Sequence, residues 1–380
     1  MLKQATSKKT ARTGSLARLH AVNRAVGDLR RGDAVLLRDG DAAALIQAAE
    51  TIDDEALARA VAWTGSAVRL ATTRRRAVAL DLAPVATASA ACVELSLPAD
   101  VGAAFLNELA DPTAMRQVSS VPIALVDAPD HGIAAAAIEL AKLARLLPAV
   151  ALFSIETKLG ALLARREGII ELAVDTIAEH RTVLARGLRR VADARVPLAD
   201  AENARIVAFR PDDGGTDHLA ILIGDPQGPG PVLARIHSEC FTGDLLGSLR
   251  CDCGEQLRGA IRAIAEAGSG VVIYLAQEGR GIGLVNKLRA YRLQDTGFDT
   301  VDANEQLGFE ADERVYQPAA EILRQLGFDN IRLLTNNPDK IEAVRRHGIT
   351  VTEHVPHAFT PNDHNRFYLT TKQAKSGHLF

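Results

Sequence analysis

The chain has 380 residues, a length that favours two domains of ordinary size. Hydrophobic residues make up 47% and charged residues 24%, which is typical of globular proteins and excludes disorder over most of the length. The formal net charge of −3 excludes a general polyanion or membrane-surface binder, so we expect no nucleic-acid partner and no membrane partner.

The N-terminus does not have the pattern of a secretory signal. Residues 1–12 are basic and polar, and no apolar core follows them. The longest apolar run, residues 146–153, is far shorter than the ~20 residues that span a bilayer. We therefore expect a cytoplasmic protein, in which clustered cysteines are metal ligands or reactive thiols rather than disulfides.

The first half of the chain alternates between helical and strand patterns. We expect residues 1–13 to form a flexible tail. Apolar residues three or four apart predict helices over 16–29, 53–64, 132–146 and 169–190. Short apolar runs predict strands over 34–37, 68–72 and 150–155. This alternation predicts a mixed α/β domain over residues 14–190.

The second half continues the alternation after a polar linker over residues 194–204. A turn at 212–215 predicts a hairpin between strands 206–209 and 218–223, and residues 224–231 form a loop. Further helices are predicted over 257–267, 315–326 and 338–347, and strands over 271–275 and 331–334. We assign residues 191–380 to a second domain.

Three of the four cysteines, Cys240, Cys251 and Cys253, fall within a short segment of the second domain. Thiolates are soft ligands that suit Zn²⁺, and a zinc ion with three protein ligands keeps one position for water, as catalytic zinc does. Two alternatives remain: the thiols are buried small residues or a redox pair, or His237 is a fourth ligand that closes a structural site.

Five blocks around these cysteines resemble GTP cyclohydrolase II. They are RIHSECFTGDLLGSLRCDCGEQL from Arg235, QEGRGIGLVNKLRAYRLQDTGFDT from Gln277, ANEQLGFEADERVY from Ala303, LLTNNPDK from Leu333 and YLTTKQAKSGHLF from Tyr368. The resemblance runs from about residue 192 to residue 380. It implies a three-layer domain that converts GTP to 2,5-diamino-6-ribosylamino-4(3H)-pyrimidinone 5′-phosphate, formate and pyrophosphate.

The same resemblance assigns catalytic roles. It makes Cys240, Cys251 and Cys253 the ligands of one zinc ion, and Tyr291 a residue that orients water or donates a proton. It makes Asp312 a proton acceptor and Arg314 a nucleophile at the α-phosphate. Because a guanidinium is almost always charged, a bidentate clamp on the phosphate is the simpler role for Arg314. Without the resemblance, Tyr291, Asp312 and Arg314 would be interpreted as surface residues.

The resemblance also implies a GTP-binding set that combines positive charge, hydroxyl donors and acceptors for guanine. The set comprises Arg235, Ile236, His237, Ser238, Glu239, Gln256, Glu278, Gly279, Arg280, Thr300, Thr335 and Lys340. Mg²⁺ is expected to accompany the triphosphate. A homodimer is the assembly that the resemblance implies.

The N-terminal half more weakly resembles 3,4-dihydroxy-2-butanone 4-phosphate synthase, which implies an α+β fold for it. The matching stretches are residues 25–37, 46–50 and 132–148. The synthase's acidic loop is reduced to Asp39 and Asp41, while its catalytic histidine and glutamate fall on Ile133 and Ser154. Without clustered carboxylates a divalent cation has no site, so we expect a degenerate domain that serves dimerisation or regulation.

Two other functions remain open at this stage. One is a bifunctional enzyme that also makes the butanone phosphate from ribulose 5-phosphate, with His131 replacing the lost histidine. The other is a GTP-binding regulatory protein without catalysis. The pathway is open as well, because riboflavin biosynthesis and other routes can use the opened pyrimidine.

Overall fold

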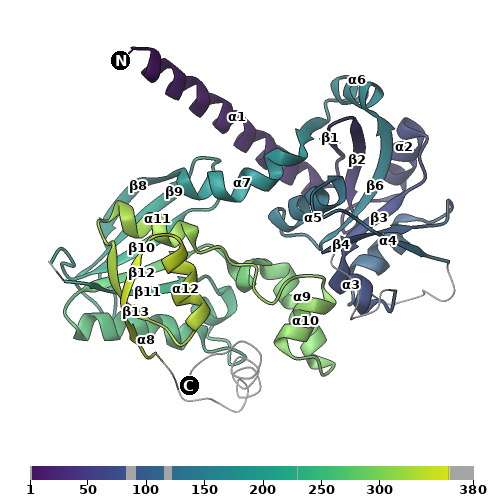
Figure 1. Ribbon diagram of the computed structural model, residues 1–380. Coiled ribbons are helices and arrows are strands. Elements are labelled where there is room, and N and C mark those ends of the chain that lie inside the picture. The colour runs from purple at the N-terminus through teal and green to yellow at the C-terminus, as the bar shows by residue number, and fades with distance from the viewer. Residues whose placement is uncertain (1, 83–90, 115–121, 229, 358, 360–380) are drawn as a thin grey trace. The chain divides into compact units, whose positions relative to one another are not determined.

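The computed structural model describes residues 2–82, 91–114, 122–228, 230–357 and 359 (Figure 1). Contacts between residues divide the chain into two units. Unit 1 comprises Met1–Arg181, Val285–Phe298 and Asp302–Asp312, and unit 2 comprises Thr182–Leu284, Asp299–Val301 and Glu313–Phe380. Unit 1 is therefore discontinuous in sequence.

Unit 1 contains a seven-stranded sheet in which one strand pair is parallel, β1 with β7, and the other pairs are antiparallel. The strand order is β5 (Ala124–Asp127), β4 (Cys92–Ser96), β3 (Arg69–Thr73), β6 (Ala149–Glu156), β2 (Ala42–Ala48), β1 (Val35–Asp39) and β7 (Ile170–Ala173). This mainly antiparallel sheet agrees with the mixed fold class expected from the sequence.

Helices cover both faces of this sheet, since successive side chains of a strand point to opposite faces. Val35 and Leu37 of β1 join the core beneath α1 (Leu2–Arg31), α5 (Ile133–Leu143) and the start of α7 (Val174–Arg186). Leu36 points to the other face and packs with Leu163 and Ala164 of α6 (Thr157–Glu167). The remaining helices of this half are α2 (Asp54–Thr64), α3 (Arg74–Ala79) and α4 (Ala103–Ala110).

Unit 2 is built on a second seven-stranded sheet. Its order is β14 (Thr350–Val355), β13 (Asn330–Leu334), β11 (Val232–Ser238), β12 (Gly270–Leu275), β10 (His218–Ile223), β9 (Ala204–Pro211) and β8 (Leu188–Arg195). The first four strands are mutually parallel and the last three add antiparallel pairs. Helices α11 (Gln317–Gln325) and α12 (Pro338–Arg346) pack on one face and α8 (Cys253–Glu266) on the other, which confirms the expected three layers.

Most of the predicted elements are present, but one prediction is wrong. Residues 169–190 were expected to form one helix, whereas they form β7, α7 and the start of β8. Pairing of β7 with β1 and of β8 with β9 overrides the helical spacing of the apolar residues. Helix α1 begins at Leu2 and so includes the residues expected to form a tail, in a stretch rich in the helix formers Lys, Ala, Gln and Arg.

Among the described residues, no helix combines the length and the apolar character needed to cross a bilayer. The C-terminal block of the resemblance, residues 368–380, lies outside the described residues.

Helix α2 offers a test of local stability. The Asp53 side chain accepts a 2.7 Å hydrogen bond from the Ala56 backbone N–H and so caps the helix. We expect Asp53→Ala to lower the free energy of unfolding by about 1 kcal/mol, measured by denaturant titration, and Asp53→Asn to change it little. Equal stability of the two variants would show that the cap contributes nothing.

Candidate metal and nucleotide site

The predicted site residues of unit 2 gather where parallel strands end. Strand β11 is followed by Glu239 and Cys240, β12 by Gln277 and Glu278, and β13 by Thr335. Parallel strands bring their carboxyl ends to one edge of the sheet, and ligands of open α/β sheets bind at that edge. The Glu239 backbone N–H donates to Leu275 O at 2.8 Å, so the chain remains paired just beyond the strand ends.

The three cysteine side chains converge at this edge. Their sulfur atoms all lie within 4.8 Å of one another, and the Sγ atoms of Cys240 and Cys251 are 3.8 Å apart. Cys240 precedes a turn of π-helix over Phe241–Leu245, and Cys253 begins α8. Among the described residues, no other group of three or more His, Cys, Asp and Glu ligand atoms is spaced closely enough to hold a metal ion.

This donor set fits a soft divalent cation. Tetrahedral ligands at the usual Zn–S distance of about 2.3 Å have sulfur atoms about 3.8 Å apart. Hydrogen bonds from Cys240 and burial raise the pKa of the Cys251 thiol to about 11 and also raise that of Cys253. The Cys251 and Cys253 thiols are therefore protonated at neutral pH in the protein alone, and a metal ion would displace those protons as it binds.

A glycine lies against the sulfur atoms. A Cβ added to Gly243 would lie 2.8 Å from Cys251 Sγ and 3.0 Å from Cys240 Sγ. The Gly243 backbone N–H also points to Cys240 Sγ at 3.3 Å. The absence of a side chain at this position is what allows the loop to close around the three thiols.

Asp244, which the sequence did not single out, holds this loop together. Its carboxylate accepts from the Cys240 backbone N–H at 3.0 Å and from the Tyr274 hydroxyl at 3.0 Å. The same carboxylate lies 3.0 and 3.1 Å from His237 Nε2. In the sequence, Asp244 lies four residues after Cys240. Carboxylates in loops are too common for this position alone to mark Asp244 as a site residue.

The geometry separates His237 from the thiol cluster. His237 is not one of the closely spaced ligand residues, and its Nε2 is engaged by Asp244. Burial lowers the pKa of His237, although the Asp244 carboxylate opposes this shift. These contacts favour a three-cysteine site over the closed four-ligand alternative.

Glu278 fixes the other side of the loop. It is buried, and its carboxylate accepts from the backbone N–H of Phe241 at 2.5 Å and of Gly279 at 2.7 Å. Each oxygen thus has a backbone donor, and Glu278 ties the end of β12 to the residue that follows Cys240.

Arg235 is buried behind the cysteines and bound on two sides. Its Nη1 donates to Leu334 O at 2.8 Å, and its Nη2 donates to Gln256 Oε1. Gln256 Nε2 in turn donates to the Asp252 carboxylate. Burial lowers the pKa of Arg235 to about 10, so the side chain is still a cation at neutral pH.

Two further cations lie over one aromatic ring in the same unit. Arg314 Cζ is 5.6 Å and Lys340 Nζ is 5.9 Å from the centre of the Tyr316 ring, both within cation–π range. Lys340 is buried and donates to Ile236 O at 2.9 Å. Together with Arg235, these side chains give the carboxyl edge a positive potential that suits a polyphosphate.

Arg280 has a strained backbone. It follows Gly279 in the left-handed region, with φ of 60° at Arg280 and 63° at Gly279. A non-glycine residue in this conformation costs of the order of 1–3 kcal/mol and is found most often at functional sites. The Glu313 backbone N–H donates to Arg280 O at 3.1 Å, which helps to hold the turn in place.

The remaining predicted residues divide between the units. In unit 2, Ser238 and Glu239 are half-buried at the end of β11, Thr335 is buried, and Thr300 begins α10 (Thr300–Gln306). Tyr291 and Asp312 belong to unit 1. Tyr291 is half-buried on α9 (Leu284–Asp295), with Lys287 Nζ 5.8 Å from its ring centre, and Asp312 is exposed.

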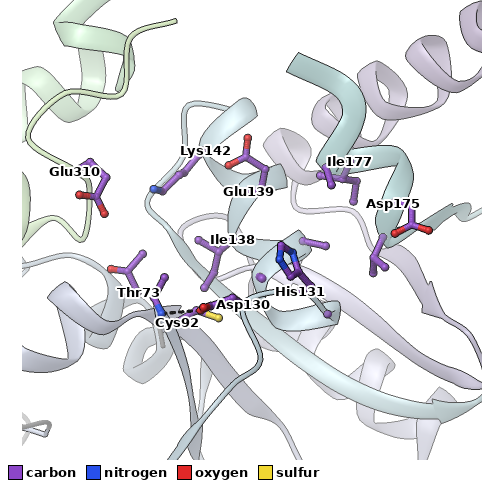
Figure 2. A pocket seen from close by; sticks show the side chains of 16 residues that line it. Thr73, Cys92, Asp130, His131, Ile138, Glu139, Lys142, Asp175, Ile177 and Glu310 are labelled. Atoms are coloured by element: carbon purple, nitrogen blue, oxygen red, sulfur yellow. Dashed lines mark hydrogen bonds between the residues drawn. The ribbon is translucent and has the colours of Figure 1, made fainter. Parts of the chain in front are cut away.

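Unit 1 has a cavity of about 320 Å³ beside α5 (Figure 2). Its polar lining comes mainly from Asp130, His131, Glu139, Lys142 and Glu310. Figure 2 shows Glu310 and Lys142 on the same side of the cavity, on different elements. His131 therefore lines a cavity, but no group of ligand atoms spaced for a metal ion includes it among the described residues.

The positions expected to replace the synthase residues have ordinary roles in unit 1. Ile133 is the first residue of α5. Ser154 on β6 accepts a 2.7 Å hydrogen bond from Arg69. Asp39 ends β1, near Gly132.

Comparison with known proteins identifies the family. The family model for GTP cyclohydrolase II matches residues 189–356. The GTP cyclohydrolase-2 of Azospirillum brasilense is 55% identical over 370 residues, covering 96% of this chain and 95% of that protein. The chain belongs to the GTP cyclohydrolase II family.

Two other relatives differ in how much of the chain they match. The GTP cyclohydrolase-2 of Salmonella typhimurium is 54% identical over 192 residues, which are 50% of this chain and 97% of that protein. The riboflavin biosynthesis protein RibBA of Phocaeicola vulgatus is 40% identical over 292 residues, covering 73% of this chain and 72% of that protein. An alignment of that length extends into the N-terminal half.

Among solved structures, RibBX, a two-domain 3,4-dihydroxy-2-butanone 4-phosphate synthase from A. baumannii, matches with a TM-score of 0.37 and 18% identity over 89% of this chain and 99% of that one. A TM-score this low does not assign a fold. The synthase-like character of the N-terminal half therefore rests on the sequence resemblance.

Gly243 provides a test of the thiol cluster. We expect Gly243→Ala to weaken zinc binding by about 10-fold or more, because the added methyl group displaces two of the sulfur atoms. Chelator competition would measure the affinity. Gly228→Ala is the matched control, since a Cβ there meets nothing within 4 Å. Equal zinc affinity in both variants would contradict a metal site at the three thiols.

Proposed function

We propose that this protein is a zinc-dependent GTP cyclohydrolase II that opens the imidazole ring of GTP, releasing formate and pyrophosphate and leaving 2,5-diamino-6-ribosylamino-4(3H)-pyrimidinone 5′-phosphate. One observation carries the proposal: three convergent thiols share the carboxyl edge of a parallel sheet with a cluster of cations. The first group suits a catalytic metal, and the second suits a triphosphate.

Cys240, Cys251 and Cys253 would hold the zinc ion. When bound, zinc with three protein ligands supplies a Lewis acid and lowers the pKa of a water molecule in its open position to about 7. Asp244 and Glu278 keep the cysteine loop in place by accepting from the backbone N–H groups of Cys240 and Phe241.

Positive side chains would bind the triphosphate. Arg235, Arg314 and Lys340 are cations at the carboxyl edge, and Arg280 lies in the strained turn after β12. We propose that Arg314 acts as an electrostatic clamp on the α-phosphate rather than as a nucleophile, because a guanidinium is almost always charged. Mg²⁺ would arrive with the triphosphate.

Polar groups at the strand ends and at the start of α10 would orient the nucleotide. Glu239 can accept from the guanine N1–H and amino group, while Ser238, Thr300 and Thr335 offer hydroxyls. His237, Gln256 and Glu278 have protein partners and would act by fixing the site. We keep Tyr291 as the residue that orients water and Asp312 as a proton acceptor, as the resemblance implies.

We propose that the domains run over residues 14–190 and 191–380 and that the first lacks synthase activity. Loss of the acidic loop, with Ile133 and Ser154 at the catalytic positions, supports this view. The match to a RibBA protein favours the alternative of a second activity. We also propose a cytoplasmic homodimer that serves riboflavin biosynthesis.

The zinc role can be tested with Cys251→Ser. We expect zinc to be lost and formate release from GTP to fall by at least about 100-fold, because even second-shell changes at metal sites cost 10–100-fold. Pyrophosphate release, which needs the cations rather than the thiols, should remain measurable.

The matched control for this variant is Cys92→Ser. Cys92 is a buried thiol of unit 1, and burial raises its pKa to about 11. We expect normal zinc content and formate release from it. Full formate release by Cys251→Ser would reject the zinc role, and no formate from the zinc-loaded wild-type protein would favour a non-catalytic GTP-binding protein.

The N-terminal half can be tested with ribulose 5-phosphate and Mg²⁺. We expect no 3,4-dihydroxy-2-butanone 4-phosphate to form, because the described residues of unit 1 include no group of three or more ligand atoms spaced to hold a hard cation. Product can be followed by NMR or mass spectrometry. Formation of the butanone phosphate, and its loss in His131→Ala, would establish the bifunctional alternative.

A further inference from the structure

One stretch of cyclohydrolase sequence belongs by its contacts to unit 1. Residues 285–298 and 302–312, which we call the docked segment, lie within the range matched by the GTP cyclohydrolase II family model but pack with the N-terminal half. The docked segment contains Tyr291 and Asp312, the two residues to which the resemblance gives proton-transfer roles. What holds it is therefore relevant to catalysis.

The first anchor is an arginine on α9 that bridges two carboxylates. Arg289 Nε donates to Asp111 at 2.8 Å and its Nη1 donates to Glu50 at 3.0 Å, with all three side chains less than one-fifth exposed. Both carboxylates are fixed on their other oxygen: Glu50 accepts from the Leu147 backbone N–H, and Asp111 accepts from Thr113. Removing one partner of such a partly buried pair is costly, because the remaining charge is left without compensation.

Asn286 extends this anchor by one helical turn. It is fully buried, its Nδ2 donates to Arg145 O at 3.0 Å, and its Oδ1 accepts from Arg289 at 2.8 Å. The face of α9 that carries Asn286 and Arg289 is thus bound to the N-terminal half.

The second anchor is the turn after α10. Thr73 Oγ1 donates to Gly308 O at 2.8 Å, and the buried Arg76 donates to Gln306 O at 3.0 Å. Gly308 has a φ of +85°, and a Cβ there would lie 2.8 Å from Thr73 Oγ1 and 3.0 Å from Pro148 Cγ. Phe309 is only 1% exposed, so the turn contributes a core residue to unit 1.

The chain that directly follows the docked segment is bound within unit 2. Val315 exchanges two hydrogen bonds with the Gln277 side chain, at 2.8 and 3.0 Å, and Glu313 donates to Arg280 O.

This docking is a property of the longer chain. The Salmonella relative aligns over 97% of its own length with half of this chain, so it has no counterpart of the N-terminal half. In the present protein the carboxylates of Glu50 and Asp111 and the hydroxyl of Thr73 come from that half. An N-terminal half without synthase activity would then still hold the docked segment in place.

We propose that the N-terminal half positions the docked segment for GTP ring opening, with Glu50, Asp111 and Thr73 as positioning residues. The proposal rests on the proposed function. It predicts that neutralising two carboxylates far in sequence from any cyclohydrolase motif slows turnover without affecting zinc or nucleotide binding, because the thiols and the phosphate-binding cations belong to unit 2.

The test uses the full-length, zinc-loaded double variant Glu50→Gln with Asp111→Asn. Both changes keep side-chain shape and the acceptors for Leu147 and Thr113. We expect kcat for formate release to fall about 10-fold or more, because small misplacements of catalytic groups cost up to about 100-fold. KM for GTP and zinc content should change less than about twofold. Hydrogen exchange should accelerate in residues 285–312 and stay unchanged in 240–254.

Two sets of variants control for general destabilisation. Glu55→Gln removes a carboxylate from an exposed pair with Arg59 in the same unit and should leave kcat and exchange unchanged. Thr73→Val should lower kcat as the double variant does, while Thr73→Ser, which keeps the hydroxyl, should restore it.

Either of two results would overturn the proposal: an unchanged kcat despite faster exchange in the docked segment, or unchanged exchange in the double variant. Wild-type protein that binds zinc but releases no formate would instead reject the proposed function. If the wild-type protein releases formate, a negative result with the variants therefore rejects the positioning proposal and leaves the proposed function intact.

Discussion

The close approach of three sulfur atoms is the constraint around which the site of unit 2 is built. The thiols come from a loop and the start of α8, so the chain must turn back on itself at Gly243, where no side chain would fit. Asp244 and Glu278 stabilise this turn by accepting backbone N–H groups on each side of Cys240. The acidic residues beside the cysteines thus shape the site rather than ligate.

Positive charge is placed next to these thiols with its own supports. Arg235 and Lys340 are buried, which would be costly for unpaired cations, but each donates to a main-chain carbonyl at or near the end of a parallel strand. The carboxyl edge of the sheet therefore supplies acceptors for the cations as well as the loops that carry the thiols. The cations suit a polyphosphate and the thiols suit a soft metal, so the two ligands would not compete for the same side chains.

Sequence reasoning recovered the layers of unit 2 and the thiol cluster, because alternating apolar runs and closely spaced cysteines are local signals. It placed the buried strand at 271–275 and the helix at 338–347 well. It failed at residues 169–190, where pairing with distant strands decides the structure. It also missed Asp244 and Arg289, whose importance comes from partners that are brought near only by the fold.

The discontinuity of unit 1 has a consequence for biosynthesis. Contacts such as Thr73 with Gly308 and Glu50 with Arg289 span 235 and 239 residues of sequence. On the ribosome, the N-terminal sheet emerges long before the segment that completes its core, and most of unit 2 must be synthesised in between. Contacts of such separation slow folding. Until the docked segment is synthesised, the apolar surface that it covers in the N-terminal half stays exposed, which makes this stage of synthesis prone to aggregation.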